Sequence, residues 1–240
     1  TLTRRAVLGA GLGLLAASLA GCGLGGGSQR LAMACGERGG TYVQFGELLR
    51  AVLERRGTAT LAVLESGGSI DNLAMLAAGE ADLAIALADA VADDDGDLVA
   101  IGRVYQNYLQ CVVRVDGPIR ALADLAGRPV SVGAPGSGAA LTAARVLEAA
   151  GLTTGSSAVA PSALQLSVAV ESLRDGTIDA FFWSGGVPIP AVLSLQREVP
   201  VTLADLTPAL PALVAAHPGE YVSTAVPSGV YGTARPIPAI

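Results

Sequence analysis

The sequence predicts an α/β protein of two similar lobes, in which mostly parallel sheets are covered by helices on both faces and a cleft lies between the lobes. Short apolar runs that suit buried strands alternate along the chain with stretches of helical spacing, a pattern typical of parallel sheets. The spacing Leu-x-x-Gly-x-x-Asp occurs in both halves, at residues 76–82 and 173–179, as a helix end followed by a strand. A length of 240 residues suits either one large domain or two small lobes.

The first lobe is predicted at residues 31–115, including the segment that crosses to the second lobe. A buried strand at 31–34 leads into a Gly-rich loop. A helix follows, because five apolar residues recur on one helical face: Phe45, Leu48, Leu49, Val52 and Leu53. Gly57 is expected to end this helix. The other predicted elements are a strand near 60–64, a helix at 70–78, a strand at 82–87, and crossover strands at 101–105 and 109–115.

The second lobe is predicted at residues 116–205, after a hinge exit at Asp116-Gly117-Pro118. It repeats the order of the first lobe. Its predicted elements are a strand at 130–132, a Gly-rich turn at 133–138, helices at 139–150 and 166–174, and a strand at 178–183. Residues 206–240 are predicted to form a return segment.

The first 22 residues are predicted to be an export signal that ends in a lipid-attachment site. Arg4 and Arg5 precede an uncharged apolar run at 6–20, which is too short to span a bilayer as a helix. The arginine pair resembles a twin-arginine signal, and residues 19–22, Leu-Ala-Gly-Cys, resemble the bacterial lipobox, whose cysteine is acylated. An ordinary cleaved signal with an incidental Cys22 is the alternative. Residues 23–30 are expected to be a flexible tether to the membrane.

Composition excludes several classes of function. A net charge of −6 argues against a nucleic-acid partner, which needs clustered basic residues. His217 is the single histidine, so neither a Ser/His pair nor a zinc cluster is expected. The acidic run at 93–97 lacks the spacing of a calcium-binding loop. The sequence therefore predicts neither a metal nor a cofactor.

Two further cysteines lie in apolar, strand-like runs. Because an exported protein meets an oxidising compartment, Cys35 and Cys111 have two interpretations. Buried free thiols are favoured, and a disulfide between Cys35 and Cys111 is the alternative.

Gly-rich turns follow four of the predicted strands, at the edge where ligands bind in open α/β sheets. They lie at residues 39–42, 67–69, 135–138 and 183–186. A helix that begins at such a turn offers free N–H groups and a positive end, which suit a carboxylate. The candidate ligand-binding residues are Thr41, Tyr42, Ser69, Asn72, Asp89, Pro135, Gly136, Ser137, Gly138, Trp183 and Gly186, with Tyr105 and Tyr231 as weaker candidates.

Several of these residues also have a purely structural interpretation. The hydroxyls of Thr41 and Ser69 suit helix caps, and Trp183 suits packing in the core. As ligand contacts, Ser137 would bind a carboxylate and Asp89 an amino group, although a solvated loop acid explains Asp89 almost as well.

A series of blocks, in order along the chain, resembles the TAXI family of TRAP-transporter solute receptors. The blocks are residues 39–42, 67–72, 79–85, 124–127, 132–138 and 175–188. The resemblance extends from about residue 31 to the end of the chain, and the blocks together are far more specific than any one of them. One departure is that the chain stops at Ile240, whereas the family continues for several tens of residues that return to the first lobe.

The resemblance implies a periplasmic-binding-protein-like fold of the second type and an extracytoplasmic receptor without enzymatic activity. It also implies a small carboxylate ligand, with glutamate or glutamine as the usual assignment, and delivery to an ion-coupled TRAP membrane subunit. Two alternatives share the fold. One is an exported enzyme that uses Ser137 or Cys35 as nucleophile, and the other is a receptor for an ABC importer or a sensor.

Overall fold

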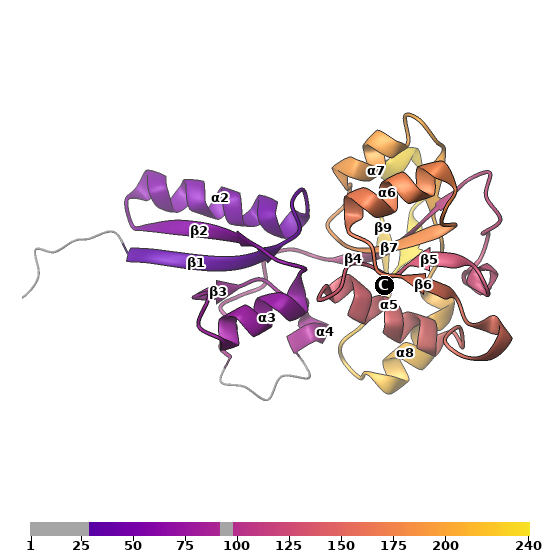
Figure 1. The fold of residues 1–240 in the computed structure, drawn as a ribbon, viewed down its shortest axis with the longest axis horizontal. Helices are drawn as coiled ribbons and strands as arrows, with labels where there is room; N and C mark the ends of the chain where they lie inside the picture. Colours follow the sequence, from indigo (N-terminus) through magenta and orange to yellow (C-terminus); the bar gives the residue numbers. More distant parts are fainter. Residues whose placement is uncertain (1–28, 92–97) are drawn as a thin grey trace, which may run out of the picture.

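The computed structural model describes residues 29–91 and 98–240, which form two lobes (Figure 1). The first lobe consists of β1 (Gln29–Gly36), α2 (Thr41–Arg56), β2 (Ala59–Glu65), α3 (Ser69–Ala77), β3 (Leu83–Ala84) and α4 (Ala88–Val91). Its sheet has the order β2-β1-β3, and all three strands are parallel. Helix α2 covers one face of this sheet and α3 covers the other. The strand predicted at 82–87 is shorter than expected, because only Leu83–Ala84 form β3.

The second lobe is built on a larger, mixed sheet. Its strands are β4 (Tyr108–Arg114), β5 (Pro129–Ser131), β6 (Ala160–Ser162), β7 (Ala180–Gly185) and β8 (Val201–Leu203), in the order β6-β5-β7-β4-β8. Strand β4 is antiparallel to both of its neighbours, whereas β5, β6 and β7 are parallel. The α-helices are α5 (Gly138–Ala149), α6 (Leu166–Asp175), α7 (Pro190–Leu195) and α8 (Leu210–Ala216). A separate antiparallel pair consists of β9 (Thr224–Val226) and β10 (Ile237–Ala239).

Four short 3₁₀ helices complete the second lobe. They are η1 (Leu122–Leu125), η2 (Gly155–Ser157), η3 (Thr207–Ala209) and η4 (Val230–Gly232). Helices α5 and α8 lie on one face of the five-stranded sheet, and α6 and α7 lie on the other (Figure 1).

The repeated Leu-x-x-Gly-x-x-Asp spacing forms the same structure in both lobes, as predicted. Gly79 and Gly176 follow α3 and α6 with φ of 71° and 74°, a left-handed conformation that glycine adopts without steric cost. The N–H of Asp82 then bonds to Ala32 on β1 at 2.9 Å, and the N–H of Asp179 bonds to Pro129 on β5 at 2.8 Å. The same turn therefore places β3 beside β1 in the first lobe and β7 beside β5 in the second.

The boundary between the lobes lies earlier than residue 115. Strand β4 belongs to the second sheet, because Cys111 and Val112 are fully buried and a strand with two apolar faces suits a central position. Residues 101–105, predicted as a crossover strand, form none. Ile101 is 84% exposed, and of the two apolar ends of this segment only Tyr105 packs against the core of the first lobe.

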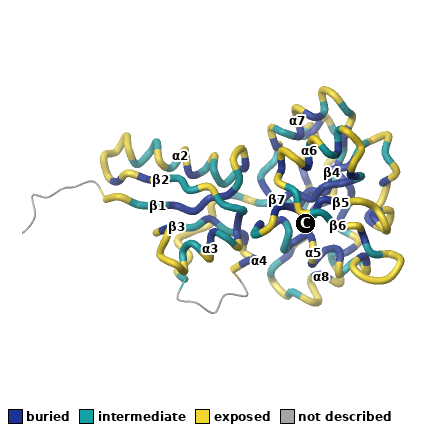
Figure 2. Tube along the Cα trace, in the orientation of Figure 1, coloured by how far each residue is buried: buried dark blue, intermediate teal, exposed yellow. Residues whose placement is uncertain are grey.

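Residues 206–240 pack on the second lobe. Leu213 and Ile240 lie in the core beneath α5, and Val226 and Tyr231 lie in the core on the opposite face of the sheet. Figure 2 shows that the buried chain is concentrated in the central strands of this lobe, whereas α2 in the first lobe is mostly exposed or half-buried.

Cys35 and Cys111 are buried free thiols, so the favoured interpretation is confirmed and the disulfide is wrong. Cys35 lies on β1 in the first lobe, and Cys111 lies on β4 in the second. Burial, with a smaller contribution from Glu47, raises the pKa of Cys35 to about 11. Burial also raises the pKa of Cys111 to about 12.

The predicted export signal, Cys22, nearly all of the predicted tether and the acidic run at 93–97 lie outside the described residues. Within 29–91 and 98–240, no helix is both long enough and apolar enough to cross a bilayer.

Candidate functional site

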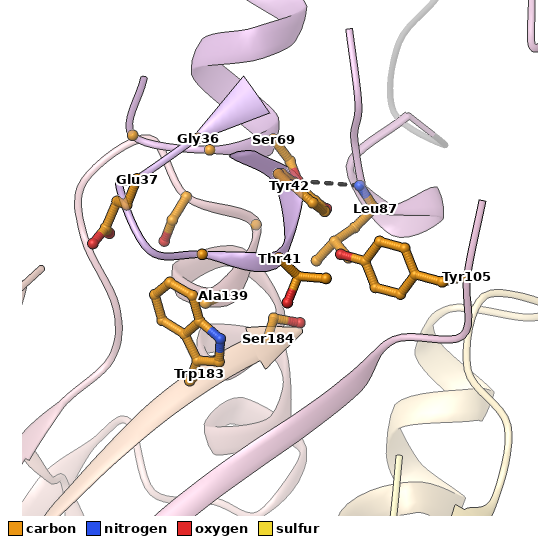
Figure 3. Close-up of a pocket in the computed structure, with 15 residues that line it drawn as sticks. Gly36, Glu37, Thr41, Tyr42, Ser69, Leu87, Tyr105, Ala139, Trp183 and Ser184 are labelled. Atoms are coloured by element: carbon orange, nitrogen blue, oxygen red, sulfur yellow. Dashed lines mark hydrogen bonds between the residues drawn. The ribbon is translucent and has the colours of Figure 1, made fainter. Parts of the chain in front are cut away.

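A small cavity of about 40 Å³ lies between the two lobes (Figure 3). The first lobe contributes the chain after β1 and β2 and the starts of α2 and α3, while the second lobe contributes the start of α5 and the end of β7. About 10–15 Å³ of such space holds one water molecule, so in this arrangement of the lobes the cavity suits only small chemical groups.

Thr41, Tyr42 and Ser69 form the polar wall of the first lobe. The hydroxyl groups of Tyr42 and Ser69 are 3.2 Å apart, and the Ser69 hydroxyl also accepts the N–H of Leu87 at 3.1 Å. Thr41 accepts the N–H of Gly186 from the second lobe at 3.3 Å. Burial raises the pKa of Tyr42 to about 12, so this phenol stays protonated over the physiological range.

Ser137, Gly138 and Trp183 form the opposite wall. The Ser137 hydroxyl caps α5 by accepting the N–H of Ala140 at 3.0 Å. The first N–H groups of a helix have no acceptor within that helix, so the start of α5 presents donors beside the cavity. Trp183 is 9% exposed, and its ring lies against Gly40 at the start of α2.

Glycines let the two lobes approach at backbone distance. A Cβ at Gly67 would lie 2.4 Å from the carbonyl oxygen of Pro135, and one at Gly136 would lie 2.1 Å from the Asp71 carboxylate. The Gly136 carbonyl in turn accepts the N–H groups of Ile70 and Asp71 at 3.0 and 3.2 Å, at the start of α3. Pro135 and Gly136, predicted as ligand contacts, therefore do not line the cavity and join the lobes instead.

Three other predicted residues also lie outside the cavity wall. Asn72 is fully buried, and its amide donates to the carbonyls of Cys35 and Ile85 at 2.5 and 2.7 Å. It holds β1 and the chain after β3 together. Gly186 contacts Thr41 rather than the cavity. Tyr231 lies in the second core, where its hydroxyl donates to Gln110 and accepts the N–H of Ile189.

Asp89 was predicted as a ligand contact or a solvated acid, and the structure places it in neither setting. It is 5% exposed, and its Oδ2 accepts the hydroxyls of Thr142 at 2.7 Å and Tyr221 at 2.8 Å. Arg145 donates to Tyr221 at 3.0 Å and to Glu220 at 2.7 Å. Asp89 belongs to the first lobe and the other residues to the second. We name Asp89, Thr142, Arg145, Glu220 and Tyr221 the interlobe polar network.

Sequence reasoning missed Glu37, which lines the cavity from the Gly-rich loop after β1. Its Oε2 accepts the N–H of Leu166, the first residue of α6 in the second lobe, at 2.9 Å. Burial raises the pKa of Glu37, and the hydrogen bond from Leu166 opposes this shift. The sequence offered one signal for Glu37 as a site residue, namely its position as a charged residue inside the glycine-rich turn at 36–40. Tyr105, a weaker candidate in the sequence, also lines the cavity.

Comparison with known proteins supports the same architecture. A family model described as the NMT1-like family matches residues 33–240. An ancestral arginine-binding protein bound to arginine is similar over 73% of this chain and 78% of its own, with 18% identity and a TM-score of 0.54. An arginine-bound mutant of ArgBP from T. maritima is similar over 73% of this chain and 81% of its own, with 16% identity and a TM-score of 0.52.

A third structure is an ancestral arginine-binding protein bound to glutamine, with 17% identity, a TM-score of 0.51, and coverage of 78% of this chain and 92% of its own. The periplasmic aliphatic sulphonate binding protein SsuA from Escherichia coli has 19% identity and a TM-score of 0.48, and the match covers 73% of this chain and 59% of SsuA. The chain thus spans about three-fifths of that protein. The similarities to the arginine-binding proteins show a type II periplasmic-binding-protein-like fold, as predicted.

Proposed function

The chain belongs to the NMT1-like family, and from this premise we propose that it is an extracytoplasmic receptor that binds a small carboxylate, such as an amino acid, between its lobes. The observation that carries the proposal is the shared cavity, whose walls come from both lobes. Ligand contacts to both walls stabilise the arrangement in which the lobes touch, and this is hinge closure around a ligand. Structures of similar fold contain arginine or glutamine, which agrees with a ligand of this chemical class.

The proposed receptor does no covalent chemistry. The hydroxyl of Ser137, one of the two candidate nucleophiles, is engaged in capping α5. Cys35, the other, has its pKa raised to about 11 by burial, whereas a nucleophilic cysteine needs a lowered pKa. Both observations favour binding over catalysis.

We further propose that Cys22 anchors the receptor to the membrane through a lipid and that the partner is an ion-coupled TRAP membrane subunit. The lipobox-like residues 19–22 support the anchor, and the TAXI-like blocks support the partner. A receptor for an ABC importer is the second candidate, because a substrate-binding protein of an amino acid ABC transporter has a similar fold, with 18% identity and a TM-score of 0.50. Uptake by vesicles that contain the TRAP subunit and an ion gradient separates the two partners.

Titration calorimetry on the purified protein, with a panel of amino acids, mono- and dicarboxylates, tests the proposed binding. We expect at least one compound to bind with micromolar or tighter affinity and to lower the radius of gyration in solution scattering. Folded protein that binds no member of the panel would contradict the proposal. For the anchor, Cys22→Ser is expected to move the protein from the membrane fraction to the soluble extracytoplasmic fraction.

A further inference from the structure

Three buried polar atoms at the cavity have no hydrogen-bond partner within the described part of the chain. They are the Oε1 of Glu37, the hydroxyl of Tyr105 and the Nε1 of Trp183. Buried polar groups in proteins are almost always paired, so orphan atoms around a cavity indicate the chemistry of its ligand. Here the unpaired groups are one acceptor on a carboxylate, one N–H donor and one phenol.

Glu37 divides its two oxygens between two environments. Oε2 accepts the N–H of Leu166 at 2.9 Å, at the start of α6, while Oε1 is buried and unpaired. The positive end of α6 favours a negative charge at this position. The neighbouring Arg38 does not compensate that charge in the cavity, because its side chain is 85% exposed and pairs with Glu65 at 2.8 Å.

Apart from Glu37, the side chains that line the cavity are uncharged. The other described residues that line it are glycine, alanine, leucine, serine, threonine, tyrosine and tryptophan. A buried carboxylate oxygen without a partner is costly, and a cationic N–H donor removes that cost through a charge-assisted hydrogen bond. A ligand carboxylate near Glu37 would instead add a second negative charge.

The other orphan atoms suit the opposite charge. Trp183 offers an N–H, Tyr105 offers an O–H, and the start of α5 offers backbone N–H groups beside Gly138. All three are donors that suit a carboxylate. The cavity therefore combines one acceptor for a cation with several donors for an anion, a combination that matches a zwitterion.

We propose that Glu37 is a specificity-determining residue that binds the α-ammonium group of a zwitterionic amino acid and discriminates against acids that lack this group. The inference rests on the proposed receptor function and narrows its ligand class. It predicts that a neutral amino acid such as glutamine is bound in preference to a dicarboxylate of similar size.

The test uses pairs of compounds that differ only in the α-ammonium group. They are L-alanine with propionate, L-glutamine with 4-carbamoylbutanoate, and L-glutamate with glutarate, titrated calorimetrically into the full chain at neutral pH. Glu37→Gln keeps an oxygen that can accept the Leu166 N–H but replaces the free carboxylate oxygen with an amide donor. Glu65→Gln is the matched control, because it removes the same charge from the exposed pair with Arg38, outside the cavity.

For the wild type, we expect each amino acid that binds to do so roughly tenfold or more tightly than its deamino partner, as for a hydrogen bond to a charged group. Glu37→Gln is expected to reduce that ratio to below about threefold, by the same hydrogen-bond argument, and Glu65→Gln to leave it unchanged. Equal affinity within the pairs, or a ratio that Glu37→Gln leaves unchanged, would overturn the role of Glu37 while the receptor function stands. If folded wild-type protein binds none of the three amino acids but binds another carboxylate of the wider panel, this inference fails while the receptor function stands. If it binds no member of that panel, both fail.

Discussion

The two lobes share a turn and the order of three parallel strands, β2-β1-β3 in the first and β6-β5-β7 in the second, but they differ in how they are stabilised. The first lobe has three parallel strands around a small core of four buried residues, Met33, Cys35, Leu61 and Ile85. The second lobe has five strands with an extensive buried core on each face. Yet the first lobe supplies most of the cavity wall, including Glu37, Thr41, Tyr42 and Ser69.

This difference suggests that the lobe with the smaller core supplies most of the contacts to a ligand, while the lobe with the larger core supplies most of the stability. Elements that bind ligands and move are drawn from the less stable parts of proteins, because they must rearrange at low cost in free energy. We therefore expect the second lobe to be the more stable of the two, and the first lobe to depend on contact with it for its order. The following predictions test that contrast, from the largest expected effect to the smallest.

Matched cavity-creating substitutions in the two cores test the contrast most strongly. Leu61 is 4% exposed in the first lobe and Leu125 is fully buried in the second, and each Leu→Ala change is expected to cost about 2–5 kcal/mol. Hydrogen exchange read by mass spectrometry should show that Leu61→Ala lowers protection in β1 and β2 alone. Leu125→Ala should lower protection in both lobes. If Leu61→Ala affects the second lobe equally, the lobes unfold as one unit and the contrast is wrong.

Gly67→Ala tests the close approach of the lobes. The added Cβ would lie 2.4 Å from the Pro135 carbonyl, so the lobes must separate, at a cost of about 1–3 kcal/mol. We expect ligand affinity to fall roughly tenfold to a hundredfold on that basis, with a larger radius of gyration in solution scattering. Gly102→Ala is the control, because no atom lies within 4 Å of the Cβ it would add. Unchanged affinity in Gly67→Ala would show that binding does not need this approach.

The interlobe polar network is tested by removing one hydroxyl. Tyr221→Phe leaves Asp89 without one of its donors across the interface, which we expect to cost about 1 kcal/mol of closure and to weaken ligand binding about fivefold. Tyr231→Phe removes a hydroxyl that is equally buried but bonded entirely within the second lobe. Calorimetry should show normal affinity for Tyr231→Phe, with a lower unfolding temperature. The reverse pattern would assign the network to stability rather than closure.

Thiol labelling compares the lobes without any mutation. Burial raises the pKa of Cys35 to about 11 and of Cys111 to about 12, so at pH 8 both are thiols and react only when their lobe opens. We expect Cys35 to be labelled faster than Cys111 in a peptide-resolved experiment. A reducing agent should not change the unfolding temperature, and a peptide that links residues 35 and 111 would contradict the structure.

Sequence patterns predicted the fold well where they are local. The left-handed glycines after α3 and α6 depend on a few neighbouring residues, and they lie where expected. The predicted apolar face of α2 is only partly right, because Phe45, Leu49 and Leu53 pack against the core whereas Leu48 is 68% exposed. The prediction that residues 109–115 belong to the first lobe was wrong, because the sheet that a strand joins depends on partners far away in the sequence. An apolar run at 109–115 looks the same whether it pairs with β3 or with β7.

For the site, the sequence indicated which turns meet but not which atoms face the cavity. Ser137 and Trp183 line the cavity, as predicted for ligand contacts. Asp89 does not, because it bonds to Thr142 and Tyr221, which lie far along the chain. Glu37 carried no periodic signal, because its position depends on α6 of the other lobe. These contacts are set by how the lobes come together, which no local pattern records.

The glycines at the lobe interface have a consequence for how the proposed site tolerates substitution. Gly67 and Gly136 are constrained by volume, since a single added carbon meets backbone or carboxylate atoms of the other lobe. Glu37, which lines the cavity and is only half-buried, is constrained instead by the hydrogen bond that it accepts from Leu166. Under the proposed function, a substitution at Glu37 is therefore expected to change which ligand binds, whereas one at Gly67 or Gly136 is expected to change how closely the lobes approach.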